Sequence, residues 1–217
     1  MNEQLVNASS DGNLVRVREL LHAGANPNIG NKYGQTPLYA ASSNGHLKVV
    51  KELLRSKAKP NIGNQCGSTP LLMASVKGYL DIVKELLAVG ADPNIANEGD
   101  TTPIYYASRN GHLEVVKELL RVGVNPNAAN RNGKTPLHLA SSKGHLQVVR
   151  ELLVVGANPN IVNGSGRRPL YKASVNGHSE IVEILESYFP SLFDLSLRSL
   201  RKFRIDISLI SFLLNYF

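Results

Sequence analysis

The sequence predicts an all-α fold, a solenoid of stacked helix-turn-helix units with projecting β-hairpin tips and a short C-terminal helical segment. Three kinds of residue recur every 33 positions and carry this prediction: a Thr-Pro pair, a proline ahead of it and a glycine behind it. They are Thr36, Thr69, Thr102 and Thr135, with Arg168 in fifth place; Pro27, Pro60, Pro93, Pro126 and Pro159; and Gly45, Gly78, Gly111, Gly144 and Gly177. Three ladders with one spacing indicate a repeated structural unit.

Each unit is expected to open with a short helix that begins at the Thr-Pro pair. Threonine is a good N-cap. Proline suits the first helical position, because an N–H group there would have no acceptor within the helix and its absence costs no hydrogen bond. A glycine nine residues after the threonine, as at Gly45, predicts the end of that helix in a left-handed conformation.

A second helix follows the glycine. Leu113, Val116 and Leu120 form an i, i+3, i+7 stripe that predicts one apolar face packed against a neighbouring unit. The next segment, such as 90–94, is rich in turn residues and predicts the end of the second helix, before an extended hairpin tip.

These features resemble the ankyrin-repeat family over residues 1 to about 189. The fullest match is the segment 133–140, Gly-Lys-Thr-Pro-Leu-His-Leu-Ala, continued by Gly144 and His145. The resemblance implies paired antiparallel helices, hairpins at right angles to them, an L-shaped stack and a protein as binding partner.

The period divides the chain into units and a tail. We expect an N-terminal capping repeat at 1–30, full repeats at 31–63, 64–96, 97–129 and 130–162, a C-terminal capping repeat at 163–189, and a tail at 190–217. The first unit lacks a Thr-Pro pair, and the last carries Arg168, Lys172 and three glutamates, a polarity typical of terminal repeats.

Composition narrows the function. The only cysteine, Cys66, cannot form an internal disulfide, and the polar start lacks a secretory signal, so we expect a cytoplasmic location, with the nucleus also open. No apolar stretch reaches the roughly 20 residues that span a membrane. The net charge of +7 permits an acidic protein or nucleic acid, but many basic residues lie beside glutamates on the second helices, so we expect no nucleic acid.

The histidines do not predict a metal site or an active site. His46, His112, His145 and His178 stand in one column, and stacked helices lie roughly 8 to 10 Å apart, too far for shared ligands about 2 Å from an ion. We interpret them as packing between repeats, and His138 as bonding locally to Thr135. No nucleophile elbow, paired carboxylates or phosphate loop accompanies them, so we expect no enzyme and no cofactor.

The columns that differ between units are the predicted partner-binding face, because framework columns are needed for packing. The predicted residues are Lys32, Tyr33, Gln35, Gln65, Cys66, Ser68, Val76, Lys77, Glu98, Thr101, Arg109, Asn110, Arg131, Asn132, Lys134, Ser142, Lys143 and Arg167. The alternative is that they vary only because they are exposed. Because the face becomes basic toward Arg167, we expect an acidic protein partner. We also expect the chain to be a monomer. Asp100 replaces the tip glycine and predicts a differently shaped tip.

The tail resembles the opening of a suppressor-of-cytokine-signalling (SOCS) box. Ser191, Leu192 and Leu200 match the segment that binds elongin in that family, while Ser196 stands where cysteine is usual and the Leu-Pro segment for cullin contact is absent. The resemblance implies Leu192, Ser196 and Leu200 as elongin-binding residues and elongin B/C with a cullin as partners.

Two alternatives for the tail remain open, a plain capping helix and a basic amphipathic helix on a membrane surface. Two functions follow accordingly. One is a substrate receptor for a ubiquitin ligase, and the other is an adaptor or inhibitor that recruits no ligase.

Overall fold

The computed structural model describes residues 1–188, which form helices joined by turns and contain no strand. The helices are α1 (Asn2–Ser10), α2 (Leu14–His22), α3 (Pro37–Ser43), α4 (Leu47–Arg55), α5 (Pro70–Lys77), α6 (Leu80–Ala88), α7 (Pro103–Asn110), α8 (Leu113–Arg121), α9 (Pro136–Lys143), α10 (Leu146–Val154), α11 (Pro169–Val175) and α12 (Ser179–Glu186). The tail at 190–217, with Leu192, Ser196 and Leu200, lies outside the described residues.

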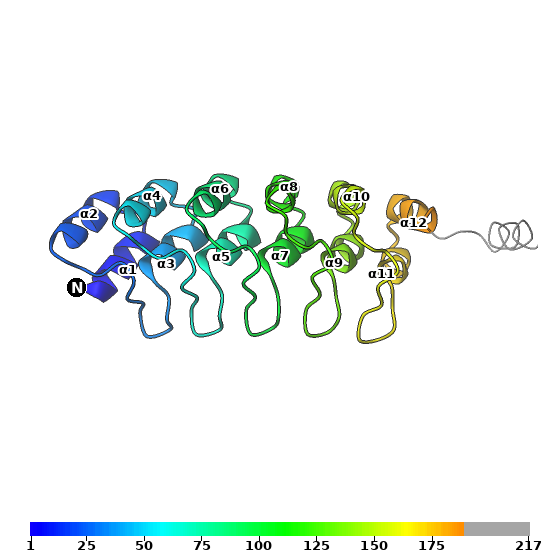
Figure 1. Ribbon diagram of the computed structural model, residues 1–217, viewed down its shortest axis with the longest axis horizontal. Coiled ribbons are helices and arrows are strands. Elements are labelled where there is room, and N and C mark those ends of the chain that lie inside the picture. The colour runs from blue at the N-terminus through cyan, green and yellow to red at the C-terminus, as the bar shows by residue number, and fades with distance from the viewer. Residues whose placement is uncertain (189–217) are drawn as a thin grey trace, which may run out of the picture.

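The helices form two layers in an elongated stack (Figure 1). The first helices of the units, α1, α3, α5, α7, α9 and α11, pack side by side, and each lies against the second helix of its own unit. The long loops before α3, α5, α7, α9 and α11 project in a row away from the second helices (Figure 1). The predicted all-α solenoid is confirmed.

The Thr-Pro pairs start the first helices as expected. Thr36, Thr69 and Thr135 are N-caps whose Oγ1 accepts a hydrogen bond from the backbone N–H three residues later, at 3.1, 3.2 and 3.4 Å. Thr102 is also an N-cap, but its buried hydroxyl has no hydrogen-bond partner among the described residues. The cap at Thr102 is therefore formed by its backbone alone.

The glycines end the first helices and provide room for the next repeat. Gly78, Gly111 and Gly144 have φ of +76° or +77° and are the C-caps of α5, α7 and α9. A Cβ on Gly78 would lie 2.5 Å from His112 Nδ1 of the following repeat. The position therefore needs glycine both for its backbone conformation and for the close approach of a histidine ring.

The second helices bury a slightly different stripe from the predicted one. In α8 the most buried residues are Val115, Val116 and Leu119, while Leu113 and Leu120 are half-buried at the edge of the core. The stripe is wider than the three predicted residues because α8 packs on α7 and on both neighbouring second helices, α6 and α10.

One apolar core runs the length of the stack. An aliphatic residue follows each Thr-Pro pair, and Leu38, Leu71, Ile104 and Leu137 have no exposed surface. Truncating such a residue to alanine typically costs about 2–5 kcal/mol, because the surroundings collapse only partly into the cavity. The core is what holds neighbouring units in register.

Candidate functional site

The loop tips are built around an asparagine that recurs every 33 residues, at 31, 64, 97, 130 and 163. In the first tip, Asn31 Oδ1 accepts hydrogen bonds from the backbone N–H of Tyr33 at 3.0 Å and of Gln35 at 3.1 Å. The other four asparagines accept the equivalent pair. Sequence analysis missed this column, although its spacing is the same as that of the Thr-Pro pairs.

The predicted β-hairpin tips are tight hydrogen-bonded turns. Gly34 N–H donates to Asn31 O at 2.8 Å, and Asn31 N–H donates to Gln35 O at 3.0 Å. Two bonds close a turn but are too few for a ladder, which explains why no strand is present in residues 1–188.

Main-chain hydrogen bonds join each tip to the next. Gln65 N–H donates to Tyr33 O at 3.1 Å, and Glu98 N–H donates to Cys66 O at 2.9 Å. The same link continues from Arg131 to Gly99 at 3.4 Å and from Gly164 to Asn132 at 2.8 Å. The tips therefore form one preformed row, so a partner need not order five separate loops.

The expectation that Asp100 reshapes its tip is wrong. Asp100 has φ +54° and donates its N–H to Asn97 O at 2.9 Å, as Gly34 does to Asn31. Aspartate is one of the few residues other than glycine that adopt this left-handed conformation. The turn hydrogen bonds and the Asn97 cap hold it there.

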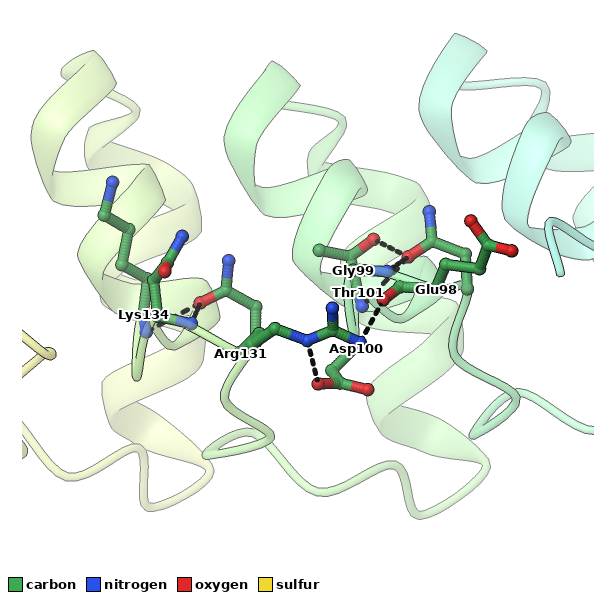
Figure 2. A network of polar contacts seen from close by, with 9 residues as sticks. Glu98, Gly99, Asp100, Thr101, Arg131 and Lys134 are labelled. Atoms are coloured by element: carbon green, nitrogen blue, oxygen red, sulfur yellow. Dashed lines mark hydrogen bonds and ion pairs between the residues drawn. The ribbon is translucent and has the colours of Figure 1, made fainter. Parts of the chain in front are cut away.

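Asp100 also contacts the following tip (Figure 2). Arg131 Nε donates to Asp100 Oδ2 at 3.3 Å, and Arg131 Nη2 donates to the main-chain O of Glu98. The guanidinium of Arg131 is therefore engaged within the stack. Figure 2 shows the side chain of Lys134 extending away from this network.

Most of the predicted partner-binding residues lie on the surface of the tips and at the ends of the first helices. The exposed ones are Lys32, Tyr33, Gln65, Cys66, Lys77, Glu98, Arg109, Asn110, Arg131, Asn132, Lys134, Lys143 and Arg167. Gln35, Val76 and Ser142 are half-buried. Besides Arg131, two of the exposed residues connect repeats through their side chains, because Gln65 Nε2 donates to Lys32 O and Asn110 Nδ2 donates to Val76 O.

Ser68 and Thr101, two of the predicted partner-binding residues, are buried, at 8% and 6% exposed. Both occupy the last position of a tip, immediately before the N-cap threonine, where the chain turns into the stack. Thr101 Oγ1 donates to Asn97 Oδ1 and so completes the tip. These two positions shape the site without presenting a side chain to a partner.

Not all of the basic residues on the predicted face are available to a partner. Lys77, Arg109, Lys134 and Lys143 are exposed, and their charged groups have no ion-pair partner within residues 1–188. Arg131 pairs with Asp100, and the Arg167 guanidinium lies 4.2 Å from the centroid of the Tyr171 ring. We call Lys77, Arg109, Lys134 and Lys143 the basic cluster.

The histidines pack between repeats as predicted. His46 Nε2 lies 2.9 Å from Ser10 O, and His112, His145 and His178 repeat this contact with the preceding unit at 3.0 to 3.2 Å. His138 Nδ1 lies 2.9 Å from Thr135 Oγ1, and its Nε2 lies 3.1 Å from Arg167 O of the next unit. Burial lowers the pKa of His138, and the nearby Lys134 lowers it further.

Tyr39 and Tyr105 occupy the position of His138 in their own units. Burial raises the pKa of both hydroxyl groups, which lie near Asn64 and Asn130 of the following tips at 3.4 and 3.1 Å. No group of three or more His, Cys, Asp or Glu side chains in the described part of the chain could hold a metal ion. Nor is any helix of that part long and apolar enough to cross a bilayer.

Comparison with known families identifies the repeats. A family model described as ankyrin repeats (3 copies) matches residues 5–97, 79–163 and 104–192, so that the matched ranges together run from residue 5 to residue 192. No curated protein matches the sequence. With the 33-residue ladders and the two-layered stack, the match shows that this chain belongs to the ankyrin-repeat family.

Proposed function

We propose that this chain uses its row of tips and the basic cluster to bind an acidic segment of another protein. As an ankyrin-repeat chain it is a protein–protein interaction scaffold. The preformed row of tips supports binding with little ordering cost, and Lys77, Arg109, Lys134 and Lys143 supply charge that residues 1–188 do not neutralise. We further propose a cytoplasmic or nuclear monomer.

We also propose that the bound protein is delivered to a ubiquitin ligase through the tail. The support comes from the resemblance of Ser191, Leu192 and Leu200 to the elongin-binding segment of a SOCS box. In this arrangement Leu192 docks in an elongin groove as an apolar anchor, and elongin B/C and a cullin are the partners. The other candidate is an adaptor or inhibitor with no ligase link, which the Ser196 replacement and the absent Leu-Pro segment favour.

Capture of a purified elongin B–C complex by the purified full-length chain tests the role in a ligase. Leu192→Asp should abolish capture. The same substitution at Leu87 would be an unsuitable control, because Leu87 packs against the core. The matched control is Val89→Asp, which places the same charge at an exposed aliphatic residue of the stack. Absence of capture by the unmodified chain would leave the adaptor as the function.

The acidic-partner proposal is tested separately, by identifying proteins captured from cell extract and measuring their affinity for charge-reversed chains. Lys134→Glu with Lys143→Glu should weaken binding at least tenfold. Lys48→Glu with Arg150→Glu makes the same change of net charge on α4 and α10, away from the tips, and should have little effect. Equal affinities of the two double variants would show that the basic cluster is not the binding site.

A further inference from the structure

The end of the described stack has an open face formed by α11 and α12. A depression of about 540 Å³ there is lined by Gly166, Arg167 and Arg168, which precede α11, and by Val162, Leu170, Tyr171, Ser174, Val175 and Glu186. We call the last six residues the end face. Tyr171 is 40% exposed and Val175 is 61% exposed, so large apolar groups lie at the surface.

Counterparts of three end-face residues, Leu170, Tyr171 and Ser174, are buried in every earlier repeat. Ser42, Ser75, Ser108 and Ser141 have no exposed surface, whereas Ser174 in the same column is exposed. Tyr105 and His138, the counterparts of Tyr171, are 7% and 3% exposed.

These columns face the following repeat. The Tyr105 hydroxyl lies 3.1 Å from Asn130 Nδ2, and His138 Nε2 lies 3.1 Å from Arg167 O, in both cases of the next unit. The columns of Leu170, Tyr171 and Ser174 therefore belong to an interface between repeats, and no further repeat within residues 1–188 covers them.

The N-terminal end of the stack is different, because polar residues replace the apolar ones there. Arg16 occupies the column of Val49, Ile82 and Val115, and Asn7 occupies that of Ala40. Arg16 and Asn7 are exposed, and Arg16 pairs with Glu19 at 2.8 Å. The N-terminal surface of the stack is thus adapted to water, as is typical of a terminal repeat.

The chain supplies a suitable cover directly after α12. Residues 190–217 comprise 28 residues, of which 15 are Leu, Ile, Phe or Tyr. Leaving this much apolar surface in water is unfavourable. The connection between repeats runs from the end of α10 at Val154 to the start of α11 at Pro169. A connection of the same length after the end of α12 at Glu186 leads to Arg201. The segment is therefore long enough to reach the next layer.

Register and charge favour the same placement. Phe203 stands 33 residues after Leu170 and so continues the column of Leu38, Leu71 and Leu137. Arg198, Arg201 and Lys202 are followed by Arg204, while α12 exposes Glu180, Glu183 and Glu186. We propose that residues 190–217 pack on the end face as a final layer, with Phe203 against Leu170 and Tyr171 and the basic residues near the glutamates of α12.

Limited trypsin digestion of the full-length chain tests this proposal, because Arg198, Arg201, Lys202 and Arg204 are cleavage sites inside the segment. Ser174→Glu adds a charge to the end face and should speed cleavage at these sites at least tenfold. Ser165→Glu makes the same substitution at the exposed tip of the same repeat and should leave the rate unchanged. Equal cleavage rates in the unmodified chain and both variants would overturn the proposal.

Ser174→Glu could speed cleavage simply by unfolding the last repeat, so a second variant tests the proposal independently. Phe203→Asp changes no described residue and should raise amide hydrogen exchange in α11 at least tenfold, while exchange in α5 stays the same. Unchanged exchange in α11 would refute the proposal. So would concentration-dependent dimerisation that Ser174→Glu abolishes without affecting tail cleavage, since a second copy would then cover the face. Neither readout involves elongin, so this proposal can fail independently of the ligase role.

Discussion

Arg131 Nε lies 3.3 Å from the carboxylate of Asp100, across the gap between two neighbouring tips. Among the five described tips, the one that lacks the usual glycine is also the one whose aspartate forms an ion pair with the next tip. Both partners are more than half exposed, so the pair itself contributes little stability. Its main effect is to fix the direction of the Arg131 side chain.

Replacing Asp100 tests what this position requires. Asp100→Gly should leave the free energy of unfolding within about 0.5 kcal/mol, because relief of the left-handed backbone offsets an exposed ion pair. Asp100→Val should cost about 1–2 kcal/mol, since a β-branched residue strongly disfavours positive φ. Urea denaturation followed by circular dichroism measures both. Equal losses for glycine and valine would mean that the carboxylate contacts, rather than φ, determine stability here.

Alanine substitutions at two glycines distinguish the cost of backbone strain from the cost of steric crowding. Gly78 and Gly90 have φ of +77° and +84°, but an added Cβ would meet the His112 ring at 2.5 Å only at Gly78. Gly90 has nothing within 4 Å. Gly90→Ala should therefore cost about 1–2 kcal/mol from strain alone.

Gly78→Ala should cost clearly more than Gly90→Ala, because the His112 ring must also move from its contact with Val76 O. Thermal or urea unfolding of the two variants gives the difference directly. A His112→Ala background should remove most of the excess, since the crowding partner is then absent. If the two alanine variants are equally destabilised, the crowding argument is wrong.

The repeat architecture was predictable because its signals are local and recur. A Thr-Pro pair specifies a helix start wherever it occurs, and Thr36, Thr69 and Thr135 all cap as expected. Thr102 shows the limit of this reasoning, because the same residue pair leaves its hydroxyl without a partner. Small shifts in backbone angle decide such bonds, and residue identity does not reveal them.

The site was less predictable than the fold because variation between repeats does not measure exposure. Ser68 and Thr101 differ from Gln35 and Lys134 in the same column, yet they are buried while Lys134 is exposed. Thr101 donates its hydroxyl to Asn97, and the half-buried Gln35 accepts a hydrogen bond from Asn31, so residue size alone does not predict which side chains of this column extend into water. The pairing of Arg131 with Asp100 joins residues 31 positions apart and could only be recognised once neighbouring tips were placed side by side.

His138 should make the stability of the stack sensitive to mild acid. Burial is the main cause that lowers its pKa, so the folded chain keeps the ring neutral below pH 6.5, where the unfolded chain takes up a proton. The unfolded state then binds more protons, and the free energy of unfolding falls as pH decreases from about 6.5 toward the folded-state pKa. A single group gives a slope of at most about 1.4 kcal/mol per pH unit.

The control for this prediction is His138→Leu, because Leu72 occupies the same column and is 1% exposed. The variant loses the hydrogen bonds to Thr135 and Arg167, so its unfolding free energy should be lower near pH 8 by about 1 kcal/mol or more. The gap between the two proteins should narrow as pH falls from 7 to 5, since only the histidine protein loses stability through this group. Urea midpoints measured at several pH values for both proteins test the prediction. A gap that stays constant with pH would show that His138 does not titrate differently in the folded and unfolded chains.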